Sequence, residues 1–133
     1  MTRSPWLADL TSPEVAELAA AGAILVVPVG STEQHGPHLP LSTDTDIALL
    51  LSRELAERRS DVVIAPAVPY GSSGEHAGFA GTLSIGQEAT EMLLLELGRS
   101  RMAGRFSSPI RLELWSRMIC LTVSTCSIWV RIG

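Results

Sequence analysis

Two short runs of apolar residues constrain the fold of this chain more than any other feature of its sequence. Residues 23–29 (AILVVPV) and 62–65 (VVIA) carry no charge and are rich in β-branched side chains. Uninterrupted hydrophobicity is typical of strands buried on both faces, whereas half-exposed strands alternate apolar and polar residues. Parallel sheets are the usual setting of such strands, and helical crossovers connect them. The two runs therefore predict an α/β fold with a parallel sheet.

The segments around these runs have the signals of helices. Residues 11–21 begin with a capping hydroxyl, an early proline and an acidic residue. Residues 47–55 have helical periodicity. A third helix is expected after a capping box formed by Ser84 and Gln87, with Gly98 as its C-terminal cap. The predicted order is helix, strand, loop, helix, strand, loop, helix, as in an open α/β sheet.

Each predicted strand is followed by a polar loop that is rich in glycine and proline. We call residues 30–43 the first loop and residues 67–82 the second loop. In open α/β sheets, ligands bind in the loops beyond the carboxyl ends of the strands. The two loops are therefore the predicted functional site.

The first loop carries a candidate pair of metal ligands, Glu33 and His35. Residues two apart in an extended backbone point to the same side, so a cation there meets one oxygen and one nitrogen ligand. A polar loop with a hydrogen-bonded histidine explains the same pair. Asp44 begins the next helix and adds a second carboxylate if the loop returns to the same strand edge. His38 is expected to form a loop hydrogen bond rather than to bind metal.

The second loop is rich in glycine and contains Glu75 and His76. These two residues are candidate acid/base groups facing the first loop, and a role in structuring their own loop is an equal alternative. The glycines do not have the dinucleotide-binding spacing, and the loop leads to no Lys or Arg. A phosphate-binding loop is therefore not expected.

Composition excludes several classes of function. All ten cationic side chains of the 133 residues are Arg, so Schiff-base and Walker-type lysine chemistry is impossible. The net charge of −4 argues against nucleic acid or an anionic membrane as the main partner and favours a small molecule or peptide. The N-terminus has no apolar core of a signal peptide, and the two cysteines are expected to be free thiols. A cytoplasmic location is expected.

Each loop contains a longer motif. Residues 30–41 (GSTEQHGPHLPL), followed by 43–45 (TDT), resemble the signature of the creatininase family of metal-dependent amidohydrolases. Residues 75–86 (EHAGFAGTLSIG) are similar to a second motif, usually H-x-x-F-P-G-T. Residues 70–86 and 92–100 are most similar to the branch that acts in mycofactocin biosynthesis, whose members cleave a peptide bond near the C-terminus of a modified precursor peptide.

The resemblance implies a three-layer α/β sandwich with a mostly parallel sheet, of which this chain holds the N-terminal half. It also implies that Glu33, His35 and Asp44 are metal ligands, with Asp44 shared between two divalent ions of Zn, Fe(II) or Mn type. Such ions lower the pKa of a bound water and polarise an amide carbonyl. By the same resemblance His76, with Glu75 beside it, lies near a peptide or small amide substrate. Full-length members commonly form homo-oligomers.

The last third of the chain departs from the family. Residues 99–133 hold six Arg and one acidic residue, and no histidine follows His76, so the later N-G-H-G-G-N-type motif of the family is absent. The expected domains are residues 1–100, the N-terminal part of a creatininase-like domain, and residues 101–133, an aberrant and poorly packed tail. Translation in a shifted reading frame would produce such a change.

Three functions remain open from the sequence. The first is a hydrolase of the family, acting on the precursor peptide or on creatinine or another cyclic amide. The second is a catalytically inactive fragment of such an enzyme, which the absent histidine favours. The third is a non-enzymatic α/β module that binds a partner through its glycine-rich loops. The joint occurrence of Glu33, His35 and Asp44 argues against this third function.

Overall fold

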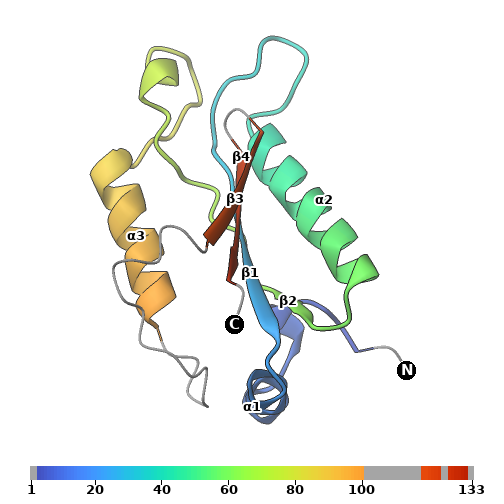
Figure 1. Ribbon diagram of the computed structural model, residues 1–133. Helices are drawn as coiled ribbons and strands as arrows, with labels where there is room; N and C mark the ends of the chain where they lie inside the picture. The colour runs from blue at the N-terminus through green and yellow to red at the C-terminus, as the bar shows by residue number, and fades with distance from the viewer. Residues whose placement is uncertain (1–2, 101–117, 124–125, 132–133) are drawn as a thin grey trace.

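The computed structural model describes residues 3–100, 118–123 and 126–131 (Figure 1). In chain order, its elements are a 3-10 helix η1 (Leu7–Asp9), α1 (Ser12–Ala20), β1 (Ile24–Val29), α2 (Thr43–Arg58), β2 (Val62–Ile64), a second 3-10 helix η2 (Gly74–His76), α3 (Gln87–Arg99), β3 (Met118–Val123) and β4 (Cys126–Arg131). Up to α3 these elements follow the predicted alternation of helices and strands.

The two predicted strands are neighbours in one sheet. β1 and β2 pair in parallel, with Ile24 opposite Val62 and Val26 opposite Ile64. This pairing confirms the expectation from the two apolar runs, and α2 is the helical crossover between them. Because the strands are parallel, their carboxyl ends lie at the same edge of the sheet, where the first and second loops begin.

Two further strands extend the sheet, in the order β2-β1-β4-β3. β4 pairs antiparallel with β1, and β3 pairs antiparallel with β4, so the described strands combine parallel and antiparallel pairing. The sequence predicts no strand in this part of the chain. Strand pairing uses backbone N–H and C=O groups, which a segment without regular hydrophobic periodicity also carries. Residues 101–117 lie outside the described residues, and the domain division near residue 100 stays a prediction.

The hydrophobic core lies between the parallel pair and α2. Its buried members come from β1 and β2 and are Ile24, Val26, Val62 and Ile64. Trp6 and Leu55 pack against them. Burial of each such aliphatic side chain contributes about 1.5–3 kcal/mol to stability. Figure 1 shows α2 on one side of the sheet and α3 on the other, which is the predicted three-layer arrangement.

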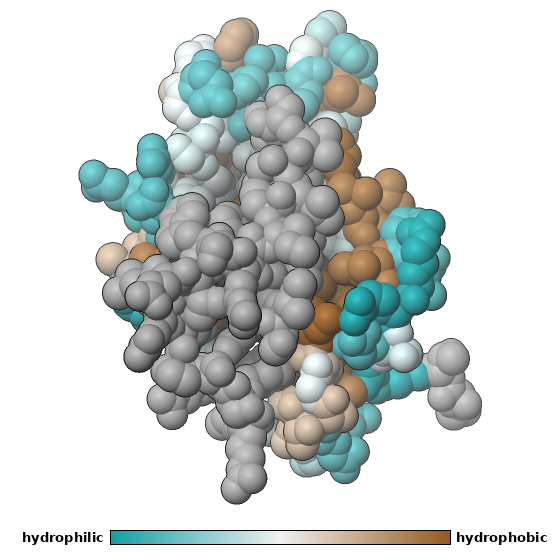
Figure 2. Space-filling view, viewed as in Figure 1, coloured by the Kyte–Doolittle hydropathy of each residue, from teal (hydrophilic) through white to brown (hydrophobic). Residues whose placement is uncertain are grey.

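The outer surfaces of the two long helices differ. α2 contacts β1, β2 and β4. In the view of Figure 2, apolar surface gathers over α2 beside a rim of hydrophilic residues, and Leu50 and Leu51 are exposed on this helix. α3 has no buried residue. Within the described ranges, none of the helices has the length and apolar character that a membrane span requires.

The start and end of α3 differ from the predicted caps. The helix begins at Gln87, after Gly86 with φ of 80°, and no side chain caps it. The hydroxyl of Ser84 instead accepts hydrogen bonds from the N–H groups of Ser73 (3.0 Å) and Gly86 (3.3 Å). α3 runs through Gly98 to Arg99. The capping-box prediction was wrong because the Ser84 hydroxyl binds the backbone of the second loop instead. The glycine-cap prediction was wrong because the helix continues through Gly98 and its C-cap is Ser100.

Candidate metal centre

A close backbone contact brings the start of α2 to the end of β1. A Cβ atom on Gly30 would lie 2.5 Å from the Cα of Thr45, so only glycine fits here without displacing backbone. The Thr45 hydroxyl also donates a hydrogen bond to the carbonyl of Ser31 (3.3 Å). Asp44 precedes Thr45 in the first turn of the helix and is therefore held beside the strand end.

The first loop folds back so that Glu33 lies inside the protein. The Glu33 N–H donates to the carbonyl of Leu41 (3.2 Å), which closes the loop. On the other side, the N–H of Leu83 donates to the carbonyl of Thr32 (2.9 Å), so the chain after the second loop runs beside the first loop. Glu33 is 2% exposed and Asp44 is 3% exposed. Two carboxylates are thus removed from solvent at one edge of the sheet.

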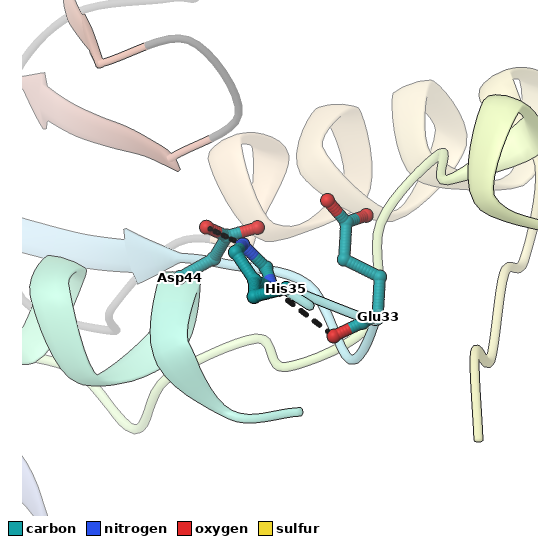
Figure 3. A group of neighbouring side chains, drawn as sticks. All are labelled: Glu33, His35 and Asp44. Atoms are coloured by element: carbon teal, nitrogen blue, oxygen red, sulfur yellow. Dashed lines mark hydrogen bonds and ion pairs between the residues drawn. The ribbon is translucent and has the colours of Figure 1, made fainter. Parts of the chain in front are cut away.

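The side chains of Glu33, His35 and Asp44 converge (Figure 3). Each offers a ligand atom, and these atoms all lie within 4.8 Å of one another. His35 Nε2 lies 3.0 Å from Asp44 Oδ1, and His35 Nδ1 lies 3.0 Å from the backbone carbonyl of Glu33. The structure therefore brings together the three residues that the sequence singles out, while their role as ligands stays a prediction.

The hydrogen bonds of His35 require a positive charge at this group. A carbonyl only accepts, so His35 Nδ1 donates to the Glu33 carbonyl, and the neutral ring then turns a lone pair on Nε2 toward the Asp44 carboxylate. Lone pairs 3.0 Å apart repel each other unless a proton or a metal ion neutralises them. In agreement, the hydrogen bond to the Glu33 carbonyl raises the pKa of His35 above its ordinary value, and the Asp44 carboxylate raises it further.

The donor set fits a divalent cation. Glu33 Oε1 is buried and accepts no hydrogen bond within the part of the chain that the structure describes. A buried carboxylate oxygen left in this way costs free energy, which a bound cation would offset. Two carboxylates and one imidazole suit Zn, Mn or Fe(II) rather than soft, thiolate-preferring ions. The hydrogen bond from His35 Nδ1 to a backbone carbonyl is the usual support of a histidine that binds metal through Nε2.

The other residues singled out in the sequence lie around this group. His76 is partly buried, and its Nε2 lies 3.5 Å from Glu33 Oε1. Glu75 and His38 are exposed, and neither makes a hydrogen bond to another described residue. The loop hydrogen bond predicted for His38 is thus not seen, and the structure leaves His38 outside the group of potential ligands.

No pattern in the sequence indicates the part that Gln34 plays. Its side-chain Nε2 lies 3.2 Å from His76 Nδ1, so it connects the first loop to the second. In an extended segment, alternate residues point to opposite sides, which suggests that Gln34 lies away from Glu33 and His35. The chain bends after Gln34, where Gly36 has φ of 74°, so the segment is not extended throughout.

The family of the chain is shown by comparison with known proteins. The creatininase family model, described as creatinine amidohydrolase, matches residues 8–108, and the chain belongs to this family. The chain is 48% identical over 107 residues to the mycofactocin precursor peptide peptidase of Mycobacterium tuberculosis (strain CDC 1551 / Oshkosh), covering 74% of this chain and 43% of that protein.

Two further relatives mark the range of similarity. The mycofactocin precursor peptide peptidase of Mycolicibacterium smegmatis is 54% identical over 92 residues, covering 65% of this chain and 36% of that protein. The creatinine amidohydrolase of Pseudomonas putida is 34% identical over 91 residues, covering 64% of this chain and 35% of that protein. The chain therefore spans less than half the length of the curated relatives it matches.

Solved creatininase structures have the same fold over the matched part. A mutant creatininase of the Zn-Zn type has a TM-score of 0.62 at 30% identity, covering 73% of this chain and 41% of that chain. A creatininase described with Mn has a TM-score of 0.64 at 30% identity, covering 77% of this chain and 43% of that chain. These proteins support the creatininase-like α/β fold and the kinds of metal ion that suit the site.

Proposed function

We propose that this chain carries the metal-binding part of a metal-dependent hydrolase of C–N bonds, whose substrate is the C-terminal region of a modified precursor peptide. The observation that carries the proposal is the buried convergence of Glu33, His35 and Asp44 at the carboxyl edge of the sheet. Family membership and the 48–54% identity to mycofactocin precursor peptide peptidases support the reaction and the substrate class.

Three side chains would hold the cation. Glu33 and Asp44 supply oxygen and His35 supplies Nε2, and Zn, Mn and Fe(II) all suit this set. When bound, such a cation lowers the pKa of a coordinated water and polarises the amide carbonyl. The protein's own contribution is to hold its two carboxylates out of water and to fix the His35 ring through its Nδ1 hydrogen bond.

The second loop would meet the substrate. His76 lies next to Glu33 and remains partly exposed, so it can contact a peptide bound over the metal centre. Glu75 precedes it on η2 and faces solvent, where it can contact the same peptide. We also expect, from the family resemblance, two ions and a homo-oligomer in full-length relatives, and a cytoplasmic location.

A second candidate is a fragment that binds metal without efficient catalysis. The chain spans 36–43% of the length of its mycofactocin relatives, and its sequence has no histidine after His76. Hydrolysis of creatinine is a third candidate because of the 34% identity to a creatinine amidohydrolase.

One experiment separates these candidates. The purified chain is loaded with Zn²⁺, Mn²⁺ or Fe(II) and given the modified precursor peptide, and release of a C-terminal dipeptide is followed by mass spectrometry. We expect metal-dependent release that Asp44→Asn abolishes and that the control His38→Ala retains. Metal binding without release favours the fragment, turnover of creatinine alone favours the third candidate, and release unaffected by Asp44→Asn contradicts the proposed site.

A further inference from the structure

The Gln34 side chain has a fixed orientation between the two loops. Its Oε1 accepts a hydrogen bond from the backbone N–H of Gly36 (2.9 Å), so its NH₂ group faces His76 Nδ1 at 3.2 Å. The reverse orientation would set the NH₂ group against a backbone N–H, with donor facing donor. Gln34 therefore donates to His76, and His76 Nδ1 must be the acceptor.

This hydrogen bond determines which nitrogen of His76 carries the proton. A neutral imidazole has one protonated and one unprotonated nitrogen, so an accepting Nδ1 places the proton on Nε2. Nε2 lies 3.5 Å from Glu33 Oε1, the buried oxygen that accepts no hydrogen bond among the described residues. The distance exceeds the roughly 2.7–2.9 Å of a charge-assisted hydrogen bond, but it places the partial positive charge of the N–H close to the carboxylate.

The ring of His76 also has two neighbouring rings. It lies nearly parallel to the His35 ring, with centroids 6.4 Å apart and an angle of 12° between the planes. The second neighbour is the Phe79 ring, whose centroid lies 6.2 Å from that of His76. These contacts and the Gln34 hydrogen bond restrict rotation of the imidazole beside Glu33.

We propose that Gln34 holds His76 in the tautomer protonated at Nε2, and that His76 is thereby a positioning residue that orients the Glu33 carboxylate toward the cation. This inference rests on the proposed metal site. A ligand role for His76 would need a free lone pair on Nε2, which the Gln34 hydrogen bond denies it. Groups that orient metal ligands typically change metal affinity by about 10–100-fold when they are removed.

The first test reads the tautomer directly. Long-range ¹H–¹⁵N correlation spectra of the metal-free, ¹⁵N-histidine-labelled chain at neutral pH report which ring nitrogen is protonated. Comparison with His76→Gln assigns the His76 signals. We expect protonation at Nε2, and a loss of that preference in Gln34→Leu. Protonation at Nδ1 alone, or a spectrum that Gln34→Leu leaves unchanged, would overturn the inference.

The second test measures Zn²⁺ affinity by competition with a chromogenic chelator. His76→Leu removes the Nε2–H donor, whereas His76→Gln keeps an N–H group at the end of the side chain. His38→Ala is the matched control, because His38 is an exposed histidine. We expect about 10–100-fold weaker binding for His76→Leu, and near wild-type binding for His76→Gln and His38→Ala. Equal affinities of the two His76 variants would contradict the positioning role.

The two tests distinguish failure of the inference from failure of the proposed function. If the unsubstituted chain binds no Zn²⁺, the metal site itself is wrong, and with it the positioning role. If the chain binds Zn²⁺ and loses it in Asp44→Asn but not in His76→Leu, the metal site stands and the role of His76 is wrong. The tautomer spectrum does not depend on metal loading or on activity.

Discussion

The first and second loops follow neighbouring parallel strands, yet the protein uses them differently. The first loop buries Glu33 to 2% exposure, and the close contact of Gly30 with Thr45 draws Asp44 of α2 to the same place. In the second loop Glu75 is exposed and only His76 turns toward the site. The difference shows that a polar loop becomes a candidate ligand site when the fold buries its charges, not when it merely carries them.

The largest effect expected from this difference concerns catalysis. If the second loop supplies no ligand, His76 does not replace the later histidine that the family resemblance implies and that this sequence lacks. Under the proposed function, a second cation would then lack a ligand, and its charge would not help to stabilise the oxyanion. Hydrolysis of the precursor peptide should be about 10²–10³-fold slower than for a full-length mycofactocin relative, the usual cost of losing one group that stabilises the oxyanion. Parallel turnover assays at equal metal loading measure this ratio, and equal rates would contradict it.

The next effect concerns the close contact between Gly30, at the start of the first loop, and Thr45 of α2. In Gly30→Ala the new Cβ meets the backbone of Thr45, which cannot move away as a side chain can. We expect a loss of about 1–3 kcal/mol in the free energy of unfolding, because the overpacked backbone must shift. Urea denaturation measures it.

The matched control for this substitution lies in the second loop. A Cβ on Gly74 meets nothing within 4 Å, so Gly74→Ala should change stability by no more than about 0.5 kcal/mol. Equal losses in the two variants would remove the distinction between the loops.

A smaller effect is expected where the two loops touch. Gly81 has φ of 88°, and a Cβ there would lie 2.5 Å from a terminal methyl carbon of Leu41. The methyl group can move, so the cost of Gly81→Ala is mainly that of the backbone conformation, about 1 kcal/mol. Thermal denaturation measures this loss of stability. A loss as large as that of Gly30→Ala would mean that the backbone of the second loop tolerates a new Cβ atom no better than that of the first.

Much of the parallel half of the fold could be predicted from the sequence. The two β-branched apolar runs are typical of strands buried on both faces of a sheet, so the β1–β2 pair and the position of both loops followed from them. The convergence of Glu33, His35 and Asp44 was also predictable, since a first loop that returns to the strand edge brings the start of α2 to the same place.

Other features depend on contacts between distant segments and could not be read locally. Ser84 has the spacing of a helix cap, but its hydroxyl accepts the N–H of Ser73 in the second loop. The pairing of β4 with β1 uses backbone groups that leave no pattern in the side chains. Gln34 acts through His76, 42 positions away in the sequence, and no spacing rule indicates such a contact.

The central claim is that the first loop and the start of α2 hold a divalent cation while the second loop contributes no ligand. Zn-edge X-ray absorption of the Zn²⁺-loaded chain counts the ligands directly. The account predicts one imidazole with oxygen ligands at about 2.0–2.2 Å, unchanged in His76→Gln. Two imidazoles at the ion, or a sulfur ligand, would contradict it.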